Sequence, residues 1–120
     1  MIAIEQRRLT QPIGTLQLER LRREFLSLMD AAGVAIQRAG LDFDECVLDR
    51  FAAMRFVGDP HVLTVEVVSL TDVARLEQPF RKLHAASHGR SPADRAVEVV
   101  VLEVCARHDP GPHGDGAPPP

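Results

Sequence analysis

The spacing of the apolar residues changes near residue 45, from a helical period to a strand period. Over residues 15–39 the apolar side chains recur at alternating steps of three and four, which places them on one face of a helix. This stripe consists of Leu18, Leu21, Phe25, Leu28, Ala32, Ala35 and Ala39. From residue 45 onward the apolar side chains alternate along the chain, as they do in a strand. The sequence therefore predicts a long helix followed by a sheet.

Both ends of the long helix carry recognisable signals. Thr15 is a suitable N-cap residue, and Gly40 suits the left-handed conformation just past a helix end. Two pairs are spaced for exposed ion pairs, Glu19 with Arg23 and Arg20 with Glu24. The stripe also has heptad spacing, which is typical of a coiled coil. We favour packing against the chain's own sheet, because the strands that follow need a covering layer.

The segment after residue 45 predicts an antiparallel hairpin. Residues 45–57 alternate with both faces partly apolar, and Leu63, Val65 and Val67 alternate with polar residues in a second strand. Between them lies a turn cluster that begins at Gly58 and ends at Pro60. Two strands joined across such a cluster are expected to pair with each other.

A second helix and a last strand complete the predicted fold. Asp72 can cap a helix over residues 72–88, but Pro79 removes one of its hydrogen bonds, so this helix either kinks or begins near residue 77. Residues 96–106, AVEVVVLEVCA, are rich in β-branched side chains and predict a central strand buried on both faces. The fold class is α+β: an antiparallel sheet covered by a long N-terminal helix and a shorter second helix.

Length and charge narrow the domain organisation and the binding partners. The 120 residues suffice for one domain, which we place at residues 1–108. Residues 109–120, DPGPHGDGAPPP, are rich in Pro and Gly and predict a flexible, disordered tail. The net charge of −3 argues against a nucleic-acid-binding protein, whose domain usually carries a basic surplus.

Features of the termini and cysteines indicate a cytoplasmic protein. The N-terminus lacks the apolar block of a signal peptide, and no apolar run approaches the length of a membrane span. Cys46 and Cys105 form no CxxC pair and suit a reducing compartment. We therefore expect no membrane partner.

Motifs for chemistry on this chain are weak. The chain has no Gly-rich phosphate loop and no activated nucleophile, so we assign it no catalytic residue and no cofactor of its own. His84 and His88 are four apart on one helix face and could share a metal, with Asp59, His61 or Glu77 available as a third ligand. We favour no metal site: His84 as a half-buried helix residue, and His88 as a C-terminal residue favoured by the helix dipole.

Arg55 interrupts an apolar strand next to the turn glycine. Its guanidinium either pairs with a carboxylate, such as Asp49 or Asp59, or points into a site. We favour the structural salt bridge.

Three blocks of the sequence resemble a known family, in the order that the family has them. Segment 50–68, RFAAMRFVGDPHVLTVEVV, resembles the family's R-x-A-x-x-R-Y-x-G-Q-x-x-x-L-T-V run. Segment 72–90 places Phe80, His84 and Gly89 in register with F-x-x-x-H-x-x-x-Y-G-Y, and VEVVVLEVCA at 97–106 is similar to V-E-x-V-N-L-R-V. The family is that of hydantoinase A, 5-oxoprolinase and acetone carboxylase, and the blocks lie near the C-terminus of its large subunits.

The chain departs from the family pattern at polar positions. Phe56 stands where the family has Tyr, Asp59 stands where it has Gln, and His88-Gly89-Arg90 replaces Tyr-Gly-Tyr. If those polar groups form a site in the family, this chain has altered it, which suits a structural role.

The resemblance implies an accessory domain that exists as its own polypeptide. Family members carry an ATPase-like fold ahead of this domain, and free-standing small subunits occur in their biotin-independent, ATP-dependent carboxylases. Large ATPase-like partner subunits would then use ATP with Mg²⁺ or Mn²⁺, and the residues that could line a partner surface or site are Arg55, Gly58, Asp59 and His84. Three alternatives stay open: a subunit of a hydantoinase- or oxoprolinase-type hydrolase, an unrelated regulatory interaction module, and a small metal-dependent enzyme that uses His84 and His88.

Overall fold

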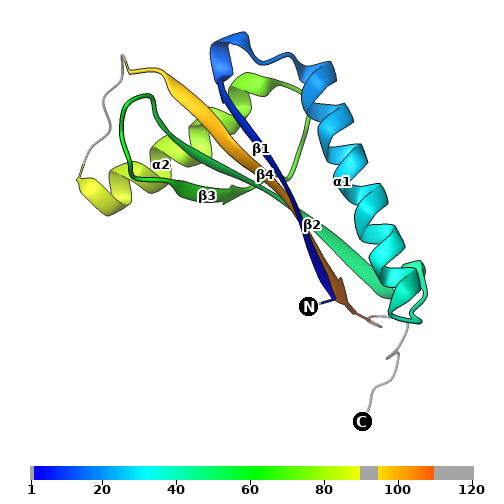
Figure 1. The fold of residues 1–120 in the computed structure, drawn as a ribbon. Helices are drawn as coiled ribbons and strands as arrows, with labels where there is room; N and C mark the ends of the chain where they lie inside the picture. Colours follow the sequence, from blue (N-terminus) through cyan, green and yellow to red (C-terminus); the bar gives the residue numbers. More distant parts are fainter. Residues whose placement is uncertain (1, 90–94, 110–120) are drawn as a thin grey trace.

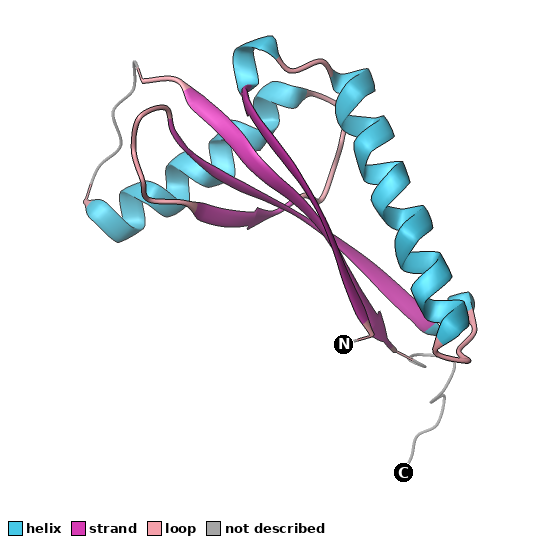
Figure 2. Cartoon of the chain, viewed as in Figure 1, coloured by secondary structure: helices cyan, strands magenta, loops and turns pink. Residues whose placement is uncertain are grey.

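A four-stranded antiparallel sheet and two helices form the fold, so the predicted α+β class is confirmed (Figure 1). The computed structural model describes residues 2–89 and 95–109. The strand order is β1-β4-β2-β3, and every neighbouring pair is antiparallel. The strands are drawn in magenta and the helices in cyan in Figure 2. The elements are β1 (Ala3–Pro12), α1 (Leu18–Arg38), β2 (Cys46–Phe56), β3 (Leu63–Glu66), α2 (Glu77–His88) and β4 (Val97–His108).

Strand β1 was not predicted from the sequence. It is an edge strand paired only with β4, and most of its side chains are at least partly exposed. Its polar composition therefore hides the strand period, because an edge strand buries little apolar surface. Arg7 of β1 pairs with Glu24 of α1 at 2.6 Å, and Glu24 also lies 3.7 Å from Arg20, as predicted. The Arg7–Glu24 ion pair joins the edge of the sheet to the helix.

Helix α1 packs on the chain's own sheet, as expected. Its buried residues are Leu21, Phe25, Leu28, Ala32 and Ile36. The expected stripe is wrong at its end: Ile36 is buried instead of Ala35, and Ala39 is exposed at the C-cap. At 100° per residue, Ile36 lies closer than Ala35 to the centre of the face that the earlier residues define.

The C-terminal end of α1 agrees with the prediction, and the N-terminal end does not. Gly40 has φ +76° and occupies the left-handed position after the helix, as predicted. Thr15 is not the N-cap; Gln17 holds that position without a side-chain hydrogen bond. The Thr15 hydroxyl instead donates to the carbonyl of Pro12 at 3.0 Å, inside the short 3₁₀ turn Ile13–Thr15.

The hairpin and the second helix follow the predicted signals. β2 and β3 pair as an antiparallel hairpin, and Gly58 in their connection has φ +87°. α2 begins at Glu77, so Pro79 lies in its first turn, where the missing N–H would have no helical partner in any case. The Asp72 carboxylate accepts from the backbone N–H of Ala74 at 3.0 Å and caps a 3₁₀ turn that leads into α2.

Within residues 2–89 and 95–109 the sheet is covered on one face only, which corrects the expectation for the last strand. β4 is central in the sheet, but its buried side chains mostly alternate: Val99 is fully buried, whereas Val101 is only half-buried. Both helices pack on the face of β2 that carries Ala52, Met54 and Phe56, and they begin near each other and diverge (Figure 1). We call the other face the open face.

Asp109 follows β4 and is hydrogen-bonded to the residue that precedes β2. The backbone N–H of Asp109 donates to the carbonyl of Glu45 at 2.8 Å. The rest of the predicted tail, residues 110–120, lies outside the described residues.

Among the described helices, none combines the length and apolar character that a bilayer crossing requires.

Candidate functional site

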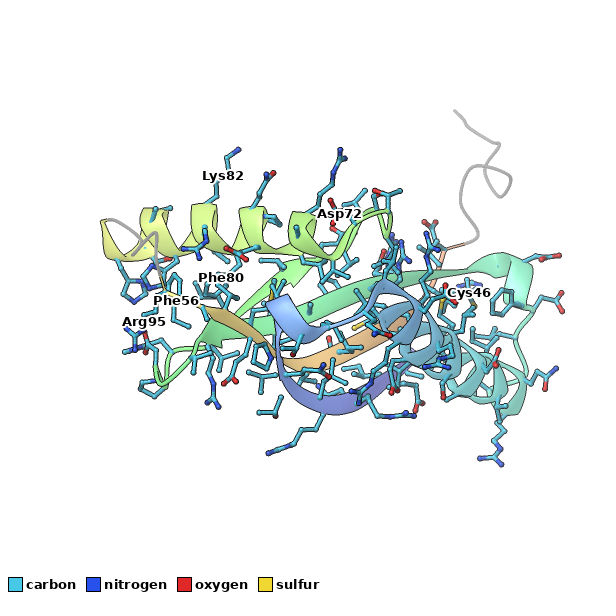
Figure 3. The ribbon with its side chains drawn as sticks, turned by 90° about the horizontal axis from the view of Figure 1, so that it is seen from above. Cys46, Phe56, Asp72, Phe80, Lys82 and Arg95 are labelled. Carbon is cyan, nitrogen blue, oxygen red and sulfur yellow. The ribbon has the colours of Figure 1, made fainter. Side chains whose placement is uncertain are left out.

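His84 lies on the sheet-facing side of α2, one turn after Phe80. Only 7% of its surface is exposed. Its ring centroid lies 4.8 Å from that of Phe56 in an edge-to-face contact and 6.0 Å from that of Phe80. Phe56 and Phe80 meet between α2 and the sheet (Figure 3). His84 therefore extends an aromatic core cluster toward the end of the helix.

Three histidines, beginning with His84, connect this cluster to the surface. The rings of His84 and His88 are stacked, with centroids 4.4 Å apart and planes 12° from parallel. The ring of His61, from the β2–β3 connection, meets His88 edge-on at 5.5 Å. We call His61, His84 and His88 the imidazole stack; it packs α2 against the connection.

The imidazole stack is poorly arranged for a metal ion. Imidazole binds a metal through a nitrogen lone pair in the plane of the ring, and the two parallel rings of His84 and His88 face each other instead. Glu77, a candidate third ligand, forms an ion pair with Arg81. In residues 2–89 and 95–109, no group of three or more His, Cys, Asp or Glu side chains could hold a metal.

The Nδ1 atom of His84 is buried and has no hydrogen-bond partner within the described part of the chain. Its ring neighbours are Phe56, Phe80 and His88. Leaving a buried polar atom without a partner costs free energy. His84 therefore stabilises this position less than an apolar ring of similar size would.

Asp59 and Gly58 shape the turn after β2. The backbone N–H of Asp59 donates to the carbonyl of Phe56 at 2.9 Å. The Asp59 carboxylate accepts from the backbone N–H of His61 and contacts its Nδ1, each at 2.9 Å, and the His61 N–H is the main reason why the pKa of Asp59 is lowered. A carboxylate that accepts a hydrogen bond from the backbone two residues further along stabilises a turn. The longer Gln of the family that the sequence resembles would not form this turn in the same way.

Arg55 forms a structural ion pair on the open face, as favoured, but with a partner that was not expected. Its Nε donates to Glu98 of β4 at 2.6 Å, and the two residues are direct cross-strand neighbours. Neither expected carboxylate is the partner: Asp49 pairs with Arg107 at 2.8 Å, and Asp59 contacts His61. Glu98 is one of two acids in the apolar strand β4, with Glu103, so the sequence alone did not single it out as the partner.

The four predicted residues do not form one site. Arg55, Gly58 and Asp59 line a shallow hollow of about 290 Å³ together with Pro60. His84 is buried against the helix-covered face, on the far side of β2 from Arg55. The hollow thus contains a cation that is paired with Glu98 and a carboxylate that is hydrogen-bonded to His61.

The cysteines do not provide a nucleophile either. Cys46 and Cys105 are both free thiols. Burial and a hydrogen bond to Glu103 raise the pKa of Cys105 to about 11, so the thiolate is scarce at neutral pH. Burial, together with Glu45 and Asp42, also raises the pKa of Cys46.

Two solved structures contain a domain with this fold. The first is an ATP-dependent caprolactamase from Pseudomonas jessenii, which matches 88% of this chain with a TM-score of 0.80 and 20% sequence identity. The second is acetone carboxylase in a nucleotide-free state, from work on ATP-dependent acetone carboxylation; it matches 92% of this chain with a TM-score of 0.71 and 16% identity. This chain covers 16% and 18% of the length of those two chains, respectively.

These likenesses concern the fold. No protein family matches the sequence. No curated protein matches it. The structural matches agree with the sequence resemblance in one respect, because acetone carboxylase belongs to the family whose motifs the chain resembles. The chain therefore has the fold of one domain of much larger ATP-dependent enzymes.

Proposed function

We propose that this chain is a small accessory subunit of a multi-subunit, ATP-dependent, biotin-independent carboxylase, similar to the small subunit of acetophenone carboxylase. One observation carries the proposal: the chain has the fold of a domain that forms less than a fifth of two ATP-dependent enzymes. The described residues support a role in assembly, because Arg55 is paired with Glu98 and the Asp59 carboxylate is hydrogen-bonded to His61.

The physical role of the subunit is packing against a larger chain. Among the elements of residues 2–89 and 95–109, none covers the open face of the sheet, and several large apolar side chains are exposed. The most exposed of them are Val68, after β3, and Leu26, on α1. Burying apolar surface against a partner removes it from water and favours the complex.

The chemistry of the complex would reside on the large ATPase-like subunits. Those subunits would bind ATP with Mg²⁺ or Mn²⁺ and activate hydrogencarbonate and a ketone for carboxylation. This chain would contribute no ligand to the nucleotide. It would hold the partner in its active arrangement in the cytoplasm.

A second candidate function is a subunit of an ATP-dependent hydrolase of the hydantoinase or oxoprolinase type. The higher TM-score, 0.80, is to an enzyme that opens a lactam. Carboxylase and hydrolase complexes are distinguished by assaying the same assembled complex for hydrogencarbonate fixation and for ATP-dependent amide hydrolysis.

Co-expression with ATPase-like large subunits from the same organism tests the proposal. The expected result is one complex on gel filtration, with higher solubility and a higher melting temperature for this chain. A partner that binds only the folded form stabilises it by about 2.7 kcal/mol at one hundred times the dissociation constant. Separate elution of the chain and the large subunits, with no change in melting temperature, would contradict the proposal.

A further inference from the structure

An apolar groove bounded by two arginines lies beside α1, apart from the candidate site residues Arg55, Gly58, Asp59 and His84. Its volume is about 290 Å³. It is lined by Arg22, Phe25, Leu26, Met29, Arg50 and Leu70. These side chains come from α1, from β2 and from the segment between β3 and α2. In the described part of the chain, no carboxylate lines the groove.

The two guanidinium groups are held in place by the segment after β3. Arg22 donates to the carbonyl of Leu70 at 2.8 Å, and Arg50 donates to the carbonyl of Val68 at 3.3 Å. Arg50 also lies over the ring of Phe25, 5.8 Å from its centroid. A guanidinium has five N–H donors, so each group keeps donors for a further acceptor. The pair is therefore fixed in position before any ligand arrives.

The charge of the groove is not balanced locally. The acid nearest to Arg22 is Glu19, whose carboxylate lies 3.9 Å away on a side chain that is 81% exposed. The sequence had suggested a different partner for Glu19, namely Arg23. On the open face, by contrast, Arg55 and Arg107 have carboxylates at 2.6 and 2.8 Å. An acidic partner therefore gains more electrostatic binding free energy at the groove than at the open face, where carboxylates already neutralise the cations.

The rim of the groove is also apolar. Leu26, which lines the groove, is 59% exposed, and Val68, whose carbonyl accepts from Arg50, is 81% exposed; they are the most exposed of the large apolar side chains described. Exposed apolar surface beside fixed cations is typical of a protein-docking site, where a buried apolar anchor supplies affinity and the charges supply orientation.

We propose that this groove is where the large subunit docks, through a segment with an apolar side chain flanked by acidic residues. This inference rests on the proposed function. The apolar side chain enters between Leu26, Met29 and Leu70, and its acidic neighbours pair with Arg22 and Arg50. The open face then serves a different contact or faces water.

Binding of purified large subunits to variants of this chain tests the groove. Leu26→Asp and Arg22→Glu are expected to weaken the affinity at least about tenfold, which corresponds to about 1.4 kcal/mol. Val34→Asp is the matched control, because Val34 is 46% exposed on the same helix and does not line the groove. It should bind as the wild type does. The affinity of the wild type should also fall more steeply with salt than that of Arg22→Glu.

The outcomes separate this inference from the proposed function. If the wild type binds and all three variants bind equally well, or if Val34→Asp weakens binding as much as Leu26→Asp, the groove is not the docking site, although the subunit role stands. If the wild type does not bind the large subunits, both fail. Sedimentation of the chain alone gives one more check: a dimer that Leu26→Asp dissociates would make the groove a self-association surface and overturn the inference.

Discussion

The rings of His84 and His88 stack face to face, with centroids 4.4 Å apart and planes 12° from parallel. The i, i+4 spacing that suggested a shared metal in the sequence therefore produces a packing contact. His84 is buried against Phe56, and His88 covers it from the exposed side. The two residues close the end of the core beneath α2.

His84→Ala is expected to destabilise the chain by about 1–3 kcal/mol, because it removes a buried ring. His88→Ala should cost less than about 0.5 kcal/mol, since that side chain is exposed. Urea denaturation of the two variants measures the difference. Zinc titration of the wild type should leave its melting temperature unchanged. A zinc-dependent rise that either variant removes would restore the metal hypothesis.

Glu98→Ala is expected to destabilise the chain by about 2–3 kcal/mol, because Arg55 loses a partner that is only 8% exposed. The cost stays below that of a fully buried pair because the Arg55 side chain is about one-third exposed, at 32%. The double variant Arg55→Met, Glu98→Leu should recover much of the loss, since it leaves no unpaired charge. A double-mutant cycle measured by chemical denaturation gives the coupling. Additive effects would indicate that the pair contributes nothing.

Val99→Asp is expected to unfold the domain, whereas Val101→Asp should leave it folded. Val99 faces the helices and is fully buried, and an unpaired carboxylate there costs several kcal/mol, comparable to the stability of a small domain. Val101 is half-buried on the open face, where water can reach an introduced charge. Circular dichroism and solubility of the two variants check this contrast. Equal loss of structure in both would mean that the open face is covered.

Cys105 is expected to react slowly with thiol reagents at pH 8, because its pKa is raised to about 11 by burial and by Glu103. In a Cys46→Ser background, Glu103→Gln should increase the rate by removing the negative acceptor. The folded pKa lies above the ordinary value of 9.0, so the folded state should lose stability as the pH rises from 9.0 toward about 11. Labelling at the same rate in both variants would exclude a role for Glu103.

The sequence was most informative where side-chain period and turn chemistry agreed. The long helix, the hairpin around Gly58 and the start of α2 at Glu77 all follow from such local signals. Strand β1 escaped prediction because an edge strand with Arg7 and Arg8 has little apolar alternation. The one-sided covering of β4 could not be predicted, since an apolar run does not say where the helices will lie.

Prediction of the candidate site from the sequence was limited in the same way. Sequence spacing placed His84 and His88 on one side of α2, but not the relative orientation of their rings. Arg55 was expected to form a salt bridge, yet its partner depends on strand register, which pairs residue 55 with residue 98. The arginine groove was missed because Arg22, Arg50 and Leu70 come together only through the tertiary fold.

ATP hydrolysis by this chain alone, by the ATPase-like large subunits alone and by the two together is the most direct test of the accessory-subunit role. The chain alone is expected to show no hydrolysis, because it offers neither a phosphate loop nor an activated nucleophile. Adding it to the large subunits should raise their ATP-dependent turnover and yield a complex that survives gel filtration. The account is contradicted if the purified chain hydrolyses ATP at the rate of the mixture, or if it remains a stable monomer and leaves the activity of the large subunits unchanged.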